Sequence, residues 1–151
     1  MFASMYAAFD ALSPAMQAYL EALTATHDGT RVFGPGSPVT IHPLVVTHPV
    51  SRRKAIYANA DFTSHINGVP RLESKRILEF LYEHCNNDLW TYRFPWRAHS
   101  AAFWDNRCVQ HKALWDYWPN VRSGFRVQLE GNADNVVPGW SADEQAQLVT
   151  A

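Results

Sequence analysis

Three side chains in the second half of the chain have the types and spacing of a site for a metal and an anion. His111 ends the segment Ala102-Phe-Trp-Asp-Asn-Arg-Cys-Val-Gln-His111; Arg122 lies 11 residues later and Arg126 four residues further on. Neutral imidazole binds metals, and the arginine fork holds a carboxylate or sulfonate by two hydrogen bonds. In a strand, Arg122 and Arg126 share one face, and Gly124 between them leaves room for a ligand. The pattern predicts one strand that carries the histidine and a second that carries the arginines.

The same residues resemble a motif of the taurine dioxygenase (TauD/TfdA) family of Fe(II)/2-oxoglutarate-dependent dioxygenases. The family pattern W-D-N-R-x-x-x-H, with two arginines downstream, is similar to the set Trp104, Asp105, Asn106, Arg107, His111, Arg122 and Arg126. Further segments look like other family blocks in the same order, namely Met1-Phe-Ala-Ser-Met-Tyr-Ala-Ala-Phe9, Thr47-His-Pro49, Arg53-Lys-Ala-Ile-Tyr57, Asn59 and Phe62-Thr63. Because several separate blocks agree in order, the resemblance is specific and extends over nearly the whole chain.

One part of the family pattern is absent from this sequence. The iron site of such dioxygenases uses two histidines and one carboxylate, and the carboxylate belongs to an upstream His-x-Asp or His-x-Glu pair. None of the seven histidines here has an acidic residue two positions later, and the family's G-D-T turn is also absent. The resemblance therefore implies that residues 1–131 are the C-terminal portion of a dioxygenase domain and that residues 132–151 form a tail.

The resemblance also implies roles for individual residues. His111 would be an iron ligand, Arg122 would hold the distal carboxylate of 2-oxoglutarate, and Arg126 would hold the anionic group of the substrate. Phe62 would line the substrate pocket, although a phenylalanine in such a segment is as often part of the core. Residues 104–107 would support the strand that aims His111. Without the resemblance, a single strand histidine and two arginines are more often surface residues.

The implied function is oxidation of a small organic acid, such as a sulfonate, with Fe(II) as cofactor and 2-oxoglutarate as co-substrate. The iron supplies the oxidising chemistry, and the protein supplies geometry and exclusion of water. Members of the family form homo-oligomers. Because the iron ligands are incomplete, two alternatives stay open. One is a non-catalytic remnant that acts as a binding or assembly module, and the other is a separate polypeptide that supplies the missing half.

Composition and charge limit the class of protein. Hydrophobic residues make up 47% and aromatic residues 13% of the chain, as is typical of a packed globular domain. The formal net charge of −1 shows no basic excess and argues against nucleic-acid binding. Cys85 and Cys108 are too few and too far apart for a disulfide framework, so we expect reduced thiols and a cytoplasmic protein. No segment has the pattern of a signal peptide or a membrane span.

The hydrophobic pattern predicts helices first and strands after. Helices are expected within Ser4–Thr24, with a break at Ser13-Pro14, and over Pro70–His84. Strands are expected at Leu44–Val46, Ala55–Tyr57, Trp90–Trp96, Ala101–Trp104 and Val121–Leu129, and a loop at Gly29–Pro38. With the resemblance, these elements imply an α+β, mainly β fold, namely part of a double-stranded β-helix (jelly roll) with flanking helices. From Asn132 onward we expect a loose tail, in which Trp140 is a candidate to dock.

Overall fold

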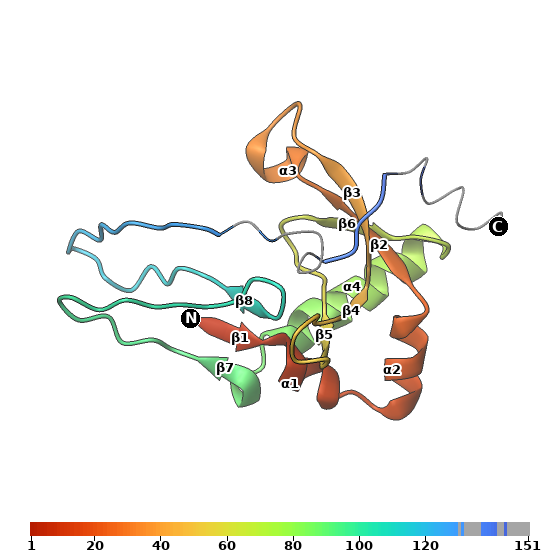
Figure 1. The fold of residues 1–151 in the computed structure, drawn as a ribbon, viewed down its shortest axis with the longest axis horizontal. Helices are drawn as coiled ribbons and strands as arrows, with labels where there is room; N and C mark the ends of the chain where they lie inside the picture. Colours follow the sequence, from red (N-terminus) through yellow and green to blue (C-terminus); the bar gives the residue numbers. More distant parts are fainter. Residues whose placement is uncertain (130, 132–136, 142–143, 145–151) are drawn as a thin grey trace.

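The computed structural model describes residues 1–129, 131, 137–141 and 144, and Figure 1 shows their arrangement. The helices in this part are α1 (Met5–Asp10), α2 (Pro14–Glu21), α3 (Thr30–Phe33), α4 (Arg71–Cys85) and the 3-10 helix η1 (Asp88–Trp90). The strands are β1 (Phe2–Ser4), β2 (Thr24–Asp28), β3 (Val39–Pro43), β4 (Val45–Thr47), β5 (Lys54–Ile56), β6 (Thr63–Ile66), β7 (Thr91–Tyr92) and β8 (Val109–His111). They form three small sheets, ordered β7-β1-β8, β3-β2-β6 and β4-β5. The expected sheet-rich chain with a few helices is confirmed, and the jelly roll stays a prediction.

Serine caps begin the first two helices. The Oγ of Ser4 accepts a hydrogen bond from the amide of Ala7 at 3.3 Å, and the Oγ of Ser13 accepts one from Met16 at the same distance. Each bond satisfies a backbone donor that the helix itself leaves free. Pro14 occupies the first helical position, where its fixed φ is favourable and its missing N–H costs nothing. The predicted break between two helices is therefore confirmed.

Helix α4 supplies one wall of the core and confirms the predicted helix. Leu78 and Leu81 are buried against the sheets and α1. Leu72, which the pattern assigned to the buried face, is 68% exposed because its position is rotated away from the side that carries Leu78 and Leu81. The hydroxyl of the buried Ser74 accepts a hydrogen bond from the amide of Ile66 on β6 at 2.8 Å, which joins helix and sheet. No helix in the described part of the chain is long and apolar enough to cross a membrane.

Strand β2 is the centre of a sheet that the sequence pattern did not predict. It pairs antiparallel with both β3 and β6. Its sequence, Thr-Ala-Thr-His-Asp, has no apolar run, and the buried apolar residues of this sheet are Ala25, Ile41 and Ile66. The next residues form the short helix α3 inside the predicted loop, and the carboxylate of Asp28 accepts hydrogen bonds from the amide and the hydroxyl of Thr30.

The β4–β5 hairpin forms as predicted. Val45 lies opposite Ile56, and both residues are buried. The basic turn after β4 is held to the first two helices by exposed ion pairs, Arg53 with Asp10 at 2.8 Å and Lys54 with Glu21 at 2.6 Å. Exposed pairs of this kind contribute little energy each, and here they link the hairpin to α1 and α2.

The β7-β1-β8 sheet carries two long arms, residues 93–104 and 112–129, which extend away from the core in Figure 1. β1 lies between β7 and β8 in antiparallel pairing. The predicted strand Trp90–Trp96 shrinks to β7, and the predicted strands Ala101–Trp104 and Val121–Leu129 are absent, so those predictions are wrong. A strand needs a neighbour to complete its ladder, and the described residues offer the arms none. The large apolar side chains at least 85% exposed on the arms include Phe103, Val121, Phe125, Val127 and Leu129.

Residues 137–141 return to the edge of β3. Trp140 exchanges two backbone hydrogen bonds with Ile41, at 2.7 and 2.8 Å. The carbonyl of Pro138 accepts a hydrogen bond from Nδ1 of His42 at 2.7 Å. Gly139 packs so closely that a Cβ there would lie 2.4 Å from Cε1 of His42. Trp140 thus docks as expected, whereas residues 132–136, 142–143 and 145–151 of the expected tail lie outside the described residues.

Candidate metal and anion site

His111 is the last residue of β8, so the predicted strand that carries the histidine is confirmed. Phe2 on β1 lies directly opposite it in the sheet. The imidazole is exposed and contacts two aromatic rings, with centroid distances of 6.2 Å to Phe2 and 4.8 Å to Trp104. Nε1 of Trp104 donates a hydrogen bond to Asn106 at 2.9 Å, which fixes the indole. The sheet and the two rings together limit the orientations that the imidazole can adopt.

The surroundings of His111 favour its neutral form. Partial desolvation lowers the pKa of the imidazole below its usual value. The positive charges of Arg126 and of the amino group of Met1 lower this pKa further. A neutral imidazole keeps one ring nitrogen free to bind a metal, so His111 has the protonation state that a metal ligand needs.

Arg122 and Arg126 lie on the second arm and not on the predicted strand. Arg126 is near enough to His111 to lower its pKa, and Arg122 contributes, after desolvation, to the lowered pKa of the Met1 amino group. The arm therefore brings both guanidinium groups near β1 and β8, although it does not form the predicted strand. Among the described residues, neither arginine has a carboxylate partner. Both groups are available to an anion.

A cavity of about 650 Å³ opens beside β8. This volume lies within the range of small-molecule sites. His111 and Phe62 both line the cavity, as does Gln128 from the second arm. Arg122 and Arg126 do not line it. The structure thus brings together the predicted metal ligand and the predicted pocket aromatic, and it leaves the two arginines outside the cavity.

Phe62 lies in the turn between β5 and β6 and is half-buried. Its amide donates a hydrogen bond to the side chain of Asn59 at 2.9 Å, and its carbonyl accepts one from the amide of Asp28 at 2.8 Å. The ring contacts Phe33 with a centroid distance of 5.6 Å. Of the two interpretations that the sequence left open, this position favours a cavity wall over the core.

The same cavity has a second wall, formed by His27, His42 and Tyr57, which the sequence pattern did not predict. The His27 ring stacks on Tyr57 at a centroid distance of 5.3 Å and lies 5.1 Å from His42. Burial, and then the neighbouring His42, lower the pKa of His27 to about 4. Burial lowers the pKa of His42 as well. The histidines share one face because His42 lies opposite Ala25, two residues from His27 on β2. Recognition of β2 and β3 as paired strands would have found them.

The described residues contain one group of three potential metal ligands, and it does not include His111. The ligand atoms of His48, Asp105 and Cys108 lie within 4.8 Å of one another. However, Nδ1 of His48 accepts hydrogen bonds from two backbone amides, and Nε2 therefore carries the proton that it shares with Asp105. No ring nitrogen of His48 is left for a metal. In the described part of the chain, no group of three potential ligands includes His111, and the other two ligands of the expected iron site are not found.

Comparisons with known proteins show the family to which the chain belongs. The family model described as "Taurine catabolism dioxygenase TauD, TfdA family" matches residues 1–128. An alpha-ketoglutarate-dependent sulfonate dioxygenase of Saccharomyces cerevisiae is 38% identical over 140 residues, which are 84% of this chain and 34% of that protein. The chain thus spans about a third of the length of this relative.

Solved structures give the same result. A taurine dioxygenase from Burkholderia xenovorans is 37% identical, with a TM-score of 0.66 over 72% of this chain and 37% of that one. The structure of AAD-2 in complex with Mn(II) and N-oxalylglycine is 28% identical, with a TM-score of 0.60 over 72% of this chain and 47% of that one. The chain belongs to the taurine dioxygenase (TauD/TfdA) family.

Proposed function

We propose that this chain is the C-terminal portion of an Fe(II)/2-oxoglutarate-dependent dioxygenase that oxidises a small organic acid such as a sulfonate. The observation that carries the proposal is the position of His111. Within the region that matches the family, it ends β8 with a neutral imidazole at a cavity of about 650 Å³. In this proposal the protein acts on a small molecule in the cytoplasm and has no nucleic-acid partner.

In this proposal His111 supplies one of the iron ligands. The second histidine and the carboxylate belong to the part of the family that this chain does not match, since the chain spans only about a third of the yeast relative. Iron and 2-oxoglutarate, when bound, supply the oxidising chemistry. The chain's own contribution is to hold the imidazole in place through β1 and Trp104, and to shield the site from water through Phe62 and the wall of His27 and Tyr57.

The two arginines of the second arm bind anions in the proposed site. Arg122 pairs with the distal carboxylate of 2-oxoglutarate, and Arg126 pairs with the anionic group of the substrate. Their lack of carboxylate partners in the described part of the chain, and the effect of the Arg126 charge on His111, support these roles. A charge-assisted hydrogen bond contributes about 1.5–3 kcal/mol, so the chain alone should bind either anion weakly. The arginines lie outside the cavity here, and binding would require the arm to close on it.

We also infer that the three sheets form part of a jelly roll whose remaining strands come from the rest of the dioxygenase domain. The arms support this inference because they are extended, lack ladder partners in the described residues and expose large apolar side chains such as Phe125 and Leu129. Residues 1–131 would then be the domain portion and residues 132–151 an appendage. Further strands laid along the arms would pair their backbone groups and cover these side chains.

Ligand-observed NMR with 2-oxoglutarate tests the anion site without iron. We expect weak saturation-transfer signals from the unaltered chain and their loss in Arg122→Ala. Arg97→Ala is the matched control, because Arg97 is also an exposed arginine on an arm and has no role in the proposal. Equal signals from all three proteins would remove Arg122 from the site. Repetition with a short alkyl sulfonate and Arg126→Ala tests the substrate role in the same way.

A non-catalytic assembly module is a second candidate, favoured by the exposed apolar side chains of the arms. Its function would be to bind another copy or a complete family member, as in the homo-oligomers of the family. Unlike the dioxygenase, such a module would not depend on His111. Sedimentation and calorimetry separate the two. An independent module should give a single defined species with one sharp thermal transition, whereas a jelly-roll portion with uncovered arms should aggregate.

A further inference from the structure

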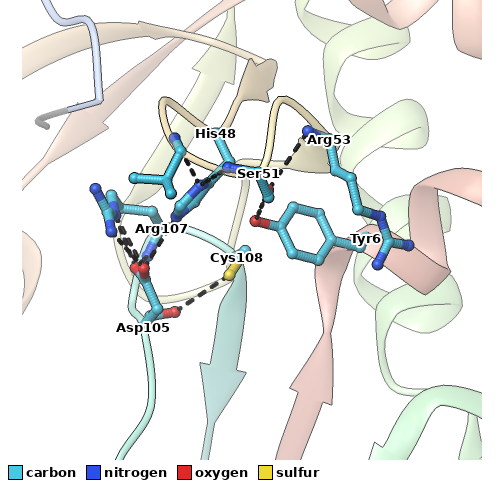
Figure 2. A network of polar contacts seen from close by, with 8 residues as sticks. Tyr6, His48, Ser51, Arg53, Asp105, Arg107 and Cys108 are labelled. Carbon is cyan, nitrogen blue, oxygen red and sulfur yellow. Dashed lines mark hydrogen bonds and ion pairs between the residues drawn. The ribbon is translucent and has the colours of Figure 1, made fainter.

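We infer that His48 is a positioning residue, which acts through Asp105 to fix the turn that begins β8 and thereby the place of His111. Figure 2 shows the hydrogen-bond network that carries this inference. The importance of His111 rests on the proposed function, but the link from His48 to β8 rests on the contacts alone. The proposed function and the positioning role of His48 can therefore be refuted separately.

The hydrogen bonds of His48 determine which ring nitrogen carries the proton. His48 lies just after β4 and is 7% exposed. Its Nδ1 is 3.2 Å from the amide of Val50 and 3.1 Å from the amide of Ser51. Because an amide can only donate, Nδ1 accepts both bonds and the proton sits on Nε2. Nε2 then donates a hydrogen bond to Oδ2 of Asp105 at 3.0 Å. The ring thus connects the turn of the β4–β5 hairpin to a residue 57 positions later.

Both carboxylate oxygens of Asp105 accept hydrogen bonds in this network. Its Oδ1 accepts hydrogen bonds from the amide and from Nε of Arg107, both at 2.9 Å. The hydrogen bond from Arg107, and to a lesser extent that from His48, holds the pKa of Asp105 well below its usual range. Asp105 is therefore a charged acceptor at any ordinary pH. A carboxylate that receives donors from two segments fixes their relative position.

The backbone of Asp105 forms the turn that precedes β8. Its carbonyl accepts hydrogen bonds from the amides of Cys108 at 3.2 Å and Val109 at 3.0 Å, which close the turn before the strand. The carbonyl of Cys108 then accepts a bond from the amide of Met5 at 2.9 Å, which ties the turn to α1. His111 follows two residues after Val109. The position of the imidazole is therefore set by the turn that Asp105 organises.

β8 depends on this turn because the strand itself is weakly held. It has three residues and lies at the edge of its sheet, with β1 as its one partner strand among the described residues. So short an edge strand has few ladder bonds to define its register. A slip of one residue would move His111 to the opposite face of the sheet and away from the cavity. The hydrogen bond from His48 to Asp105 opposes such a slip.

The hairpin side of the network is itself held in place. The hydroxyl of Tyr6 on α1 forms a hydrogen bond with that of Ser51 at 2.8 Å. The guanidinium of Arg53 lies over the Tyr6 ring, 4.5 Å from its centroid, and the same ring meets His48 edge-on at 6.0 Å. His48 is thus anchored to α1 on one side and holds Asp105 on the other, so that it can transmit position to β8.

Two substitutions of His48 separate its two hydrogen-bonding functions. The side-chain oxygen of Asn takes the place of Nδ1, so His48→Asn keeps the acceptor for the turn amides and loses the donor to Asp105. The side-chain amide of Gln takes the place of Nε2, so His48→Gln keeps the donor to Asp105. His99→Asn is the matched control, because His99 is exposed and has a φ of 64°, which Asn accommodates well.

The test is residue-level hydrogen exchange by NMR on the full chain without metal, with ¹⁵N spectra of the histidine rings. We expect His48→Asn to speed exchange of the β8 amides by roughly ten- to a hundredfold and to shift the ring signals of His111. We expect β2, β3 and β6 to keep their protection, and His48→Gln and His99→Asn to behave like the unaltered chain. The inference is overturned by unchanged β8 exchange in His48→Asn, by equal effects of the Asn and Gln variants at His48, or by loss of protection across all three sheets. None of these results depends on whether the chain binds iron or 2-oxoglutarate.

Discussion

Acidification should destabilise the fold through His27 before the carboxylates titrate. Burial beside His42 lowers the pKa of His27 from 6.5 to about 4 in the folded chain, whereas the unfolded chain has the ordinary value. Between these two values the unfolded chain binds the extra proton and the folded chain does not. The free energy of unfolding is therefore unaffected by His27 above about pH 6.5 and falls as the pH drops from 6.5 towards 4.

The size of this effect follows from the shift and from the position of the ring. A difference of 2.5 between 6.5 and 4 would correspond to about 3 kcal/mol for a group with no access to solvent. His27 lines the cavity and is only half-buried, so solvent screens part of this amount, and we expect about 1–2 kcal/mol. The other side of the His27 ring stacks on Tyr57 at a centroid distance of 5.3 Å.

Urea unfolding at a series of pH values from about 7 to about 4.5 measures the effect. His27→Gln removes the titrating group and should remove that part of the pH dependence, and what remains would include the contribution of His42. His65→Gln is the matched control, since His65 is an exposed histidine on the neighbouring strand β6. If the unaltered chain and His27→Gln lost stability equally with falling pH, the assignment to His27 would be wrong.

Three further outcomes are expected. The chain should bind Fe(II) no better than weakly, because one imidazole leaves the ion mostly to water; a micromolar or tighter one-to-one site in calorimetry, abolished by His111→Ala, would contradict this. Ser74→Ala should lower the free energy of unfolding by about 1–3 kcal/mol, because the buried amide of Ile66 loses its acceptor, while the exposed Ser123→Ala should change it by less than about 0.5 kcal/mol in denaturant titrations. The isolated chain should associate through its exposed arms, so a monodisperse monomer with one sharp thermal transition in sedimentation and calorimetry would count against a jelly-roll portion.

The elements that could be predicted are those whose own residues favour one kind of secondary structure. Ser4 and Ser13 bring their own capping oxygens, and the apolar side chains of α4 recur at helical spacing, so these helices form nearly where the pattern puts them. The β4–β5 hairpin and β8 have apolar or motif residues that mark them. The resemblance to the family also identified His111, whose position on the cavity no property of the residue itself would indicate.

The elements that could not be predicted depend on distant parts of the chain. β2 consists largely of threonine, histidine and aspartate, and it becomes a strand because β3 and β6 arrive on either side. Residues 121–129 have the opposite character, since their side chains suit a strand but the described residues supply no partner. The same reasoning explains why His48 was overlooked: its partner Asp105 is 57 residues away, and only folding brings them together.

The return of Trp140 to β3 has a consequence for the solubility of the chain. β3 is an edge strand, since β2 occupies its other side. The free edge of such a strand is a template on which another chain can add a strand of its own. The two backbone bonds between Trp140 and Ile41 occupy the middle of that edge, and a side chain at Gly139 would require the His42 ring to shift. Residues 137–141 therefore protect the edge of β3 from pairing with another chain. A chain shortened before Val137 should aggregate by strand addition at this edge, independently of the apolar arms.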